Sequence, residues 1–323
     1  MVRIARILCP VDFSESSRRA LERAAVLAGW YEAELVALHV APLPPALLSL
    51  APGVSHATLE PFDVEAMAGE LQSFTAQVAA RRPGLQLIVR SGAAAPVILD
   101  LAREMGADLL VLGIHGRSGV RKLVLGSVAE RVVDKAPCPV LTVALAAEGS
   151  PDTPVFRHVL CGVDFSEASR RAVELAISLA EEAGGRLTLM HSVEWVTDDR
   201  HPTPPATFGV KLYHQSLLTE ARARLSELVP AEARDWCRVD FRAACGEPAA
   251  EILRAAEAEG ADLIVIGADR PGPIDRMLFG SVAPLVIRQA ACPVLTVGSR
   301  CAGARHEAPH RPAPVAGPAA GPN

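Results

Sequence analysis

The chain carries ARILCPVDFSESSRRALERA at residues 5–24 and repeats it as RHVLCGVDFSEASRRAVELA at residues 157–176. Each copy begins with a short apolar run, passes through Asp-Phe-Ser, and continues with apolar residues at helical spacing. In the first copy the positions i, i+3, i+4 and i+7 are occupied by Leu21, Ala24, Ala25 and Ala28. The pattern predicts a buried strand, a turn, and a helix that packs on the strand.

Other stretches show that the repeat spans two whole domains. Three further motifs recur, namely GADLLVLG (106–113) as GADLIVIG (260–267), LGSVA (125–129) as the similar LFGSVA (278–283), and CPVLTV at 138–143 and 292–297. The register is nearly constant, since Asp164 minus Asp12 is 152 and Gly267 minus Gly113 is 154. A period of this length indicates a duplicated domain rather than a solenoid. The predicted organisation is a domain at 1–145, a linker at 146–155, a domain at 156–299 and a disordered, Pro-rich tail at 300–323.

Strand-like and helix-like segments alternate within each copy. In the first copy we expect strands at Ile4–Cys9, Leu35–Val40, Leu85–Val89, Asp108–Gly113 and Val140–Val143, and a helix whose inner face holds Ile98, Leu101 and Ala102. Alternation of this kind predicts an α/β fold, with two tandem, doubly wound, Rossmann-like parallel-sheet domains. Ligands of such sheets bind beyond the carboxyl ends of the strands.

Composition argues against several classes of protein. The net charge of −5 argues against a nucleic-acid partner, because phosphate backbones are bound by basic faces. No apolar run approaches the ~20 residues that cross a bilayer, and the first strand follows the N-terminus without a signal-peptide core. The seven cysteines include no CxxC pair, and four lie in apolar runs, namely Cys9, Cys138, Cys161 and Cys292. We therefore expect buried thiols, no structural zinc site and a cytoplasmic protein without membrane contact.

Asp12 follows the first predicted strand, and Ser14 is placed to cap the next helix. At the carboxyl end of a strand, the Asp12 carboxylate could accept hydrogen bonds from a ligand hydroxyl or amine. It could equally cap a turn, and the sequence leaves both roles open. The strand-two histidines, His39 and His191, are expected to be structural rather than catalytic.

The fourth strand runs into Gly113, Ile114, His115 and Gly116, and nine residues later come Gly126 and Ser127. Glycines let the backbone approach a ligand, and the amide groups at a helix N-terminus favour an anion. This arrangement predicts a phosphate cradle. Ser127-Val128-Ala129-Glu130 also fits a capping box, in which the serine caps its own helix.

The spacing of these residues resembles that of a known family, the ATP-binding subclass of the universal stress proteins. That family's motif is G-x2-G-x9-G-[S/T], which Gly113, Gly116, Gly126 and Ser127 match fully. The strand-end aspartate, the Leu-His-Val strand and both CPVLTV strands extend the resemblance over both halves, and it omits only the linker and tail. It implies a nucleotide-binding fold of the HUP type.

The resemblance also implies a ligand and its contacts. ATP, with or without Mg²⁺, would place its adenine and ribose near Pro10, Val11, Asp12 and Val40, and its phosphates on Gly113, Gly116, Gly126, Ser127 and the amide of Val128. The family pairs such domains through their last strands, so the two halves would form an internal pseudo-dimer. A homodimer stays open, and the sequence indicates no protein partner.

The second copy departs from this motif. Asp164, Gly267, Gly280 and Ser281 are kept, but the second glycine is replaced by Arg270 within Arg-Pro-Gly-Pro. The prolines remove backbone donors from the loop. Three further positions change, with Gly162 for Pro10, Ser192 for Val40 and Pro284 for Glu130. We expect a weakened or altered second site, although Arg270 and Arg276 could themselves contact a phosphate.

Three functions are compatible with these motifs. The leading one is an ATP-binding, nucleotide-dependent regulatory protein of the stress response. The second is a slow ATPase or a nucleotidyl-transfer enzyme, for which only Asp12 and His115 are candidate bases. The third is an interaction module without nucleotide, whose glycines serve tight packing. His306–His310 has the letters of a metalloprotease motif, but Pro309 makes the required helix improbable.

Overall fold

The computed structural model describes residues 2–42, 64–114, 125–144, 156–193, 208–268 and 282–299. The first copy contains β1 (Arg6–Val11), α1 (Glu15–Trp30), β2 (Glu34–Ala41), α3 (Val64–Arg81), β3 (Gln86–Ser91), α4 (Ala94–Glu104), β4 (Leu109–Gly113), α5 (Ser127–Lys135) and β5 (Val140–Val143). The second contains β6 (His158–Gly162), α6 (Glu167–Glu182), β7 (Arg186–Val193), α7 (Phe208–Glu227), α8 (Ala233–Trp236), β8 (Arg238–Cys245), α9 (Pro248–Glu259), β9 (Leu263–Gly267), α10 (Val282–Gln289) and β10 (Val294–Val297). The predicted linker and tail lie outside the described residues.

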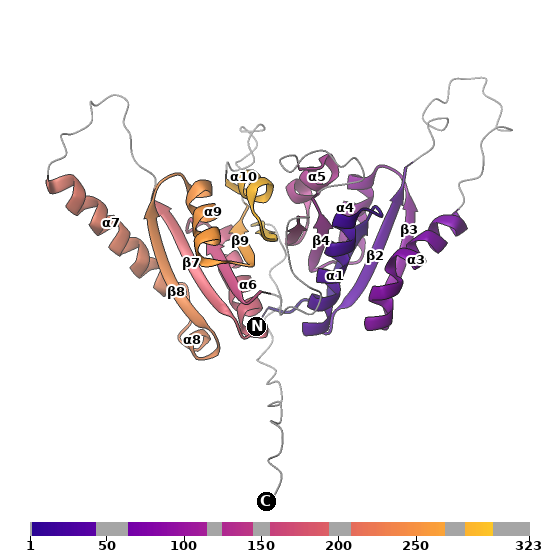
Figure 1. The fold of residues 1–323 in the computed structure, drawn as a ribbon, viewed down its shortest axis with the longest axis horizontal. Coiled ribbons are helices and arrows are strands. Elements are labelled where there is room, and N and C mark those ends of the chain that lie inside the picture. Colours follow the sequence, from indigo (N-terminus) through magenta and orange to yellow (C-terminus); the bar gives the residue numbers. More distant parts are fainter. Residues whose placement is uncertain are drawn as a thin grey trace, which may run out of the picture.

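The strands of both copies join in one sheet, which has ten strands among the described residues (Figure 1). Their order is β3-β2-β1-β4-β5-β10-β9-β6-β7-β8, and each half is parallel throughout. The two halves meet where β5 pairs with β10 in antiparallel register. The α/β class and the internal pseudo-dimer are therefore confirmed.

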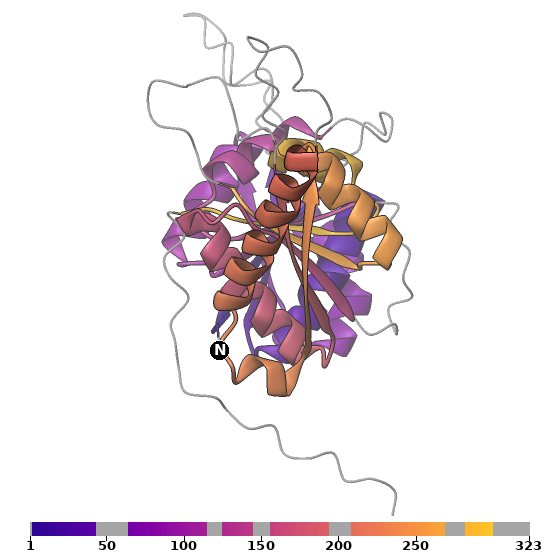
Figure 2. The same ribbon diagram turned by 90° about the vertical axis from the view of Figure 1, so that its left-hand side faces the viewer.

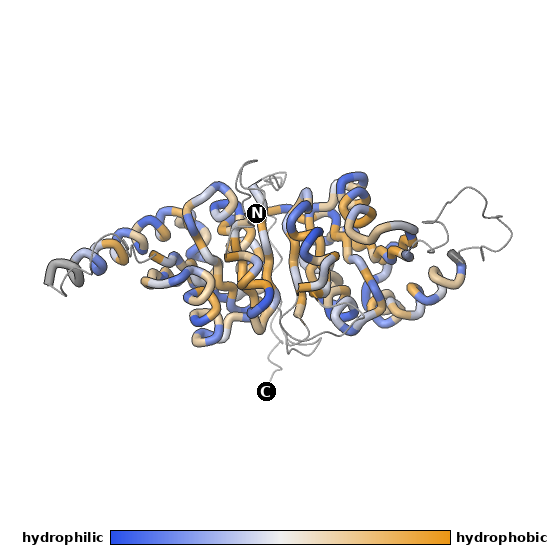
Figure 3. The backbone as a smooth tube through the Cα atoms, turned by 90° about the horizontal axis from the view of Figure 1, so that it is seen from above, coloured by the Kyte–Doolittle hydropathy of each residue, from blue (hydrophilic) through white to orange (hydrophobic). Residues whose placement is uncertain are grey.

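Helices cover both faces of the sheet, as a doubly wound domain requires (Figure 2). One core contains side chains from α1, α3, α6 and α7, and the other contains side chains from α4, α5, α9 and α10. Hydrophobic residues concentrate inside each half and hydrophilic residues face outward (Figure 3). Of the predicted inner face of α1, Leu21, Ala24 and Ala28 are buried, whereas Ala25 is half-buried.

The predicted strands are present with small shifts at their ends. β5 has the expected bounds, whereas β1 begins and ends two residues later than expected. Ile4 is buried but precedes the residues that pair with β2. Ile4 is apolar because it is buried, although it does not pair with β2. An apolar run therefore extends beyond the paired strand, which is the physical reason for the shift.

The junction between the halves is a continuous part of the core. Thr142 donates its hydroxyl to the Val294 carbonyl at 3.0 Å, and Thr296 donates to the Val140 carbonyl at 3.2 Å. These reciprocal bonds fix the register of β5 against β10. Among the described residues, no helix is long and apolar enough to cross a membrane.

Candidate functional site

The turn between β1 and α1 holds Asp12 in a fixed position. Its Oδ1 accepts hydrogen bonds from the Ser14 amide at 3.0 Å and the Ser14 hydroxyl at 2.5 Å. Ser14 in turn accepts the Ser17 amide, so the predicted N-cap is confirmed. Asp12 thus has the turn-capping role. Its other oxygen, Oδ2, has no hydrogen-bond partner within the described part of the chain.

Phe13 adopts a left-handed backbone conformation with φ of 63°. A bulky residue in this region is strained, at a cost of about 1–3 kcal/mol. Packing holds it there, since the His39 ring stacks at 4.3 Å and the Phe74 ring lies edge-on at 5.5 Å. His39 Nδ1 donates to the Val11 carbonyl at 2.8 Å, which only accepts. This histidine is buried and hydrogen-bonded, as expected of a structural residue, and it supports the turn.

The second copy builds the same turn. Phe165 has φ of 64° and lies 4.7 Å from the His191 ring, and His191 Nδ1 donates to the Val163 carbonyl at 2.6 Å. The guanidinium of Arg224, from α7, lies 3.9 Å above the Phe165 ring. Both copies therefore retain the strained turn, and the differences between them lie elsewhere.

The first glycine of the motif has a packing role. A Cβ on Gly113 would lie 2.4 Å from the Ser16 hydroxyl and 2.7 Å from the Ser16 carbonyl carbon. A Cβ on Gly267 would lie 2.6 Å from the Ser169 amide nitrogen. Each glycine ends the strand that lies beside the first strand of its copy, and lets the start of α1 or α6 approach closely. This role requires no ligand.

Helix α5 begins with its amide groups uncapped by a side chain. Gly126 is the N-cap, its carbonyl accepts the Glu130 amide at 2.9 Å, and it makes no side-chain cap bond. Ser127 is therefore the first helical residue and is exposed, as is Val128 at 38%. The capping box suggested by the sequence does not form, and Gly126 rather than Ser127 is the N-cap. The open N-terminus is suited to an anion.

The predicted site residues of the first copy gather at one edge of the sheet. β1 lies between β2 and β4, and all three strands end at this edge, so two groups come together at the point where the strand order reverses. These are Pro10, Val11, Asp12 and Val40 from β1 and β2, and Gly113, Gly126, Ser127 and Val128 from β4 and α5. Gly116, His115 and the His306–His310 segment lie outside the described residues.

The corresponding edge of the second copy is closed above β6. Gly162 is buried, and a Cβ there would lie 2.7 Å from Ile252 Cδ1 and 3.1 Å from Ile266 Cγ2. Pro10 occupies this position in the first copy and is half-buried. Ile98 of α4 matches Ile252 of α9, so the difference comes from the glycine, which lets α9 pack more closely over β6 than α4 packs over Pro10.

The second edge also carries an additional buried acid. Glu251, in the first turn of α9, is 8% exposed, and its Oε1 accepts a hydrogen bond from Arg254. The matching residue of α4 is Val97. Nearby, the Ser192 hydroxyl donates to the Gly246 carbonyl at 2.7 Å. The α9 side of the second edge is thus more polar and more acidic than the α4 side of the first.

Asp164 is exposed and repeats the contact of Asp12, accepting the Ser166 amide at 2.9 Å. Partial desolvation of the carboxylate raises the pKa of Asp164, but hydrogen bonds from Ser166 and Ser169 outweigh it and hold the pKa below its usual range. Gly280 and Ser281 lie outside the described residues.

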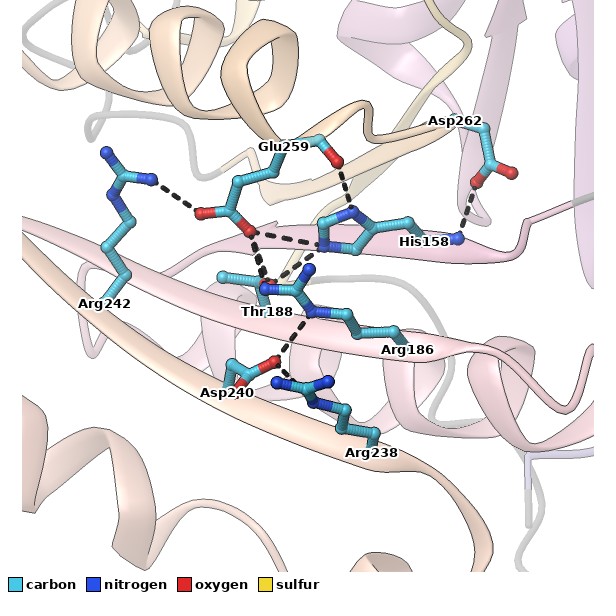
Figure 4. A network of polar contacts seen from close by, with 8 residues as sticks. All are labelled: His158, Arg186, Thr188, Arg238, Asp240, Arg242, Glu259 and Asp262. Atoms are coloured by element: carbon cyan, nitrogen blue, oxygen red, sulfur yellow. Dashed lines mark hydrogen bonds and ion pairs between the residues drawn. The ribbon is translucent and has the colours of Figure 1, made fainter.

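A partly buried polar network occupies the opposite edge of the second copy (Figure 4). Glu259 accepts hydrogen bonds from Arg242 at 2.6 Å, Thr188 at 3.1 Å and Arg186 at 3.2 Å. Its backbone carbonyl lies 3.1 Å from His158 Nδ1. Burial raises the pKa of Glu259, but these bonds and the arginine charges lower it below the usual range. In the first copy Val36 and Met105 stand where Thr188 and Glu259 do.

This network was not predicted from the sequence. The signal was present, because aligning the two copies sets a threonine and a glutamate against apolar residues. Among the described residues, no group of three or more His, Cys, Asp or Glu is arranged to hold a metal ion.

Comparison with known proteins identifies both halves. The Universal stress protein family model matches residues 3–144 and 156–298. A universal stress protein of Mycolicibacterium smegmatis is 28% identical over 300 residues, covering 91% of this chain and 97% of that protein. A universal stress protein structure from Archaeoglobus fulgidus matches with a TM-score of 0.59 at 21% identity, over 91% of this chain and 98% of that one. A putative universal stress protein from Pseudomonas aeruginosa matches with a TM-score of 0.61 at 17% identity, over 91% and 93%. At these identities the two structures show the fold alone.

Proposed function

Because this chain belongs to the universal stress protein family, we propose that its first copy binds ATP and that the bound nucleotide controls the shape or partners of a stress-response protein. The observation that carries the proposal is the uncapped start of α5, where Ser127 and Val128 are exposed at the edge that Asp12 also reaches. Backbone amides and the helix dipole there favour phosphate.

The neighbouring residues fit the rest of a nucleotide. Pro10 and Val40 are half-buried apolar residues on the α4 face of the sheet, suited to a purine. Asp12 keeps its Oδ2 for a ribose hydroxyl while Oδ1 holds the turn. An accompanying Mg²⁺ would take its ligands mainly from phosphates and water, as this ion commonly does.

We expect about one ATP per chain. The position matching Pro10 is covered by Ile252 in the second copy, and Glu251 adds a carboxylate to that edge. The first feature leaves less room for the nucleoside, and the second disfavours an anionic ligand. The domain bounds of 1–145 and 156–299 remain part of this proposal. So does the cytoplasmic location, which is supported by six described cysteines that form no disulfide.

A nucleotide-free interaction module is the second candidate, and the packing of Gly113 against Ser16 favours it. That contact accounts for one motif glycine without a ligand. It does not account for the open N-terminus of α5, because a module would lose nothing by capping that helix.

The deciding experiment changes the charge at the N-cap. Gly126→Asp supplies a preferred cap residue, so α5 should be at least as stable, but its carboxylate would stand where the phosphates bind. Gly126→Ala is the matched neutral control, because it adds the same Cβ, 3.3 Å from the Ile114 carbonyl, without an oxygen that could cap the amides of α5. ATP affinity and nucleotide stoichiometry are measured by calorimetry, together with the melting temperature.

ATP binding should be in the micromolar range, about −8 kcal/mol, and should be lost in Gly126→Asp but retained in Gly126→Ala. Wild-type protein that is folded and takes up no ATP would establish the module instead. Two equivalent ATP molecules per chain would contradict the proposed closure of the second copy.

A further inference from the structure

Helices α5 and α10 come from different copies and lie near one another across the junction (Figure 1). Antiparallel pairing of β5 with β10 places them there. Arg288, in the last turn of α10, lies 3.6 Å from the Glu130 carboxylate of α5. Both side chains are partly exposed, at 39% and 46%. As a contribution to stability alone, such a pair would be small.

Glu130 has a second possible partner, which the structure leaves unused. The sequence Ser127-Val128-Ala129-Glu130 has the letters of a capping box, in which the glutamate would turn back to the Ser127 amide. Helical side chains lean toward the N-terminus, so the Glu130 carboxylate lies beside the first turn of α5. It turns instead to Arg288, and the helix begins at Ser127.

The second copy lacks the equivalent pair. Pro284 stands at the position of Glu130, and Asp134 stands at the position of Arg288. The ion pair between the copies therefore lies beside the start of α5 and has no counterpart in the second copy. That terminus is also the one whose amides the proposed ATP site uses.

We infer that Arg288 of the second copy is a positioning residue for the nucleotide site of the first. It holds Glu130 away from the capping box and so keeps the amides of α5 free for phosphate. The expected effect on ATP binding rests on the proposed function, whereas the contact between Arg288 and Glu130 does not. It gives the second copy a role in the site of the first.

The test is a double-mutant cycle on the full chain. The variants are Arg288→Gln, Glu130→Ala and the pair together, and Glu130→Ala removes the capping-box carboxylate. Arg254→Gln is the matched control, because Arg254 pairs with Glu251 on α9 of the same copy. The measurements are the Kd values of ATP and of adenosine, and hydrogen exchange at the amides of residues 127–130 in nucleotide-free protein.

Arg288→Gln should weaken ATP binding about fivefold, the strength of a typical cap, and leave adenosine binding unchanged. It should also slow exchange at the first turn of α5. Neither effect should appear when Glu130 is alanine, and Arg254→Gln should resemble wild type.

Equal exchange at residues 127–130 in Arg288→Gln and wild type would overturn the inference, whether or not ATP binds. An equal loss of ATP affinity in the Glu130→Ala background would also overturn it, since Arg288 would then act on phosphate directly. If wild-type protein binds no nucleotide but exchange at residues 127–130 is slower in Arg288→Gln than in wild type, the positioning role of Arg288 is upheld and the proposed function is refuted.

Discussion

Helices α4 and α9 occupy equivalent places over the two halves of the sheet, but they are anchored differently. Helix α4 has Ala93 as its N-cap, without a side-chain cap bond, and Met105 as its C-cap. Helix α9 is capped by the Glu247 carboxylate, covers Gly162 with Ile252, and ends in the Glu259 network. The second copy thus fixes its covering helix at both ends with its own side chains.

The difference indicates how a duplicated domain can diverge. The first copy leaves Pro10 partly open and the amides of α5 uncapped, so some of its stability can depend on a ligand. The second copy closes the same edge and is stabilised internally. What the copies share is therefore structural, and what separates them is the candidate site.

The largest expected change in stability concerns the glycines that end β4 and β9, because both copies use them in the same packing contact. Gly113→Ala and Gly267→Ala should each destabilise the protein by about 2–4 kcal/mol, because the new methyl group meets backbone atoms that cannot move aside. Gly69→Ala is the control, since nothing lies within 4 Å of its Cβ and the site is in α3. Denaturant unfolding measures the change. A marked difference between Gly113→Ala and Gly267→Ala would show that the two copies do not share this contact.

The next effect should be confined to the second copy. Glu259→Gln should cost about 2–3 kcal/mol at pH 7, because Arg186 and Arg242 lose a carboxylate that is only 16% exposed. The folded-state pKa of Glu259 is lowered, so its contribution is complete above the unfolded value of about 4.3 and is lost as the pH falls through the folded value. Unfolding free energies of both proteins between pH 7 and pH 3 should therefore converge. Glu257→Gln, at an exposed position of the same helix, is the control, and a constant gap would count against the network.

A smaller loss of stability is expected at Gly162, where Ile252 covers the end of β6. Gly162→Ala should cost about 1–2 kcal/mol, because its methyl group would meet the Ile252 Cδ1 atom at 2.7 Å. Ile252→Val removes that atom at a cost of about 0.5–1.5 kcal/mol. Thermal unfolding of the double variant should show a loss well below the sum of the two. Additive losses would mean that Ile252 does not close this position.

The fold was predictable because its signals are local and repeated. CPVLTV predicts β5 to the residue, and Asp-Phe-Ser predicts the Ser14 cap. The start of α5 was not predictable, because the carboxylate that completes its capping box contacts Arg288 in the other copy. The role of Gly113 depends on the distance between α1 and β4, which no spacing along the chain reports. The Glu259 network likewise joins residues of three strands and a helix that are far apart in sequence.

The smallest effect separates structure from site most sharply. Ser14→Ala and Ser166→Ala each remove an N-cap and should each cost about 1 kcal/mol, measured by thermal unfolding. The Ser14 hydroxyl also donates to Asp12 at 2.5 Å. Without it the Asp12 carboxylate is held less firmly in the orientation that the proposed ribose contact requires. Calorimetry should therefore show weaker ATP binding in Ser14→Ala and unchanged binding in Ser166→Ala. Equal ATP affinity in both variants would mean that Asp12 only caps its turn, and the first copy would then differ from the second in the start of α5 and the cover over β1 alone.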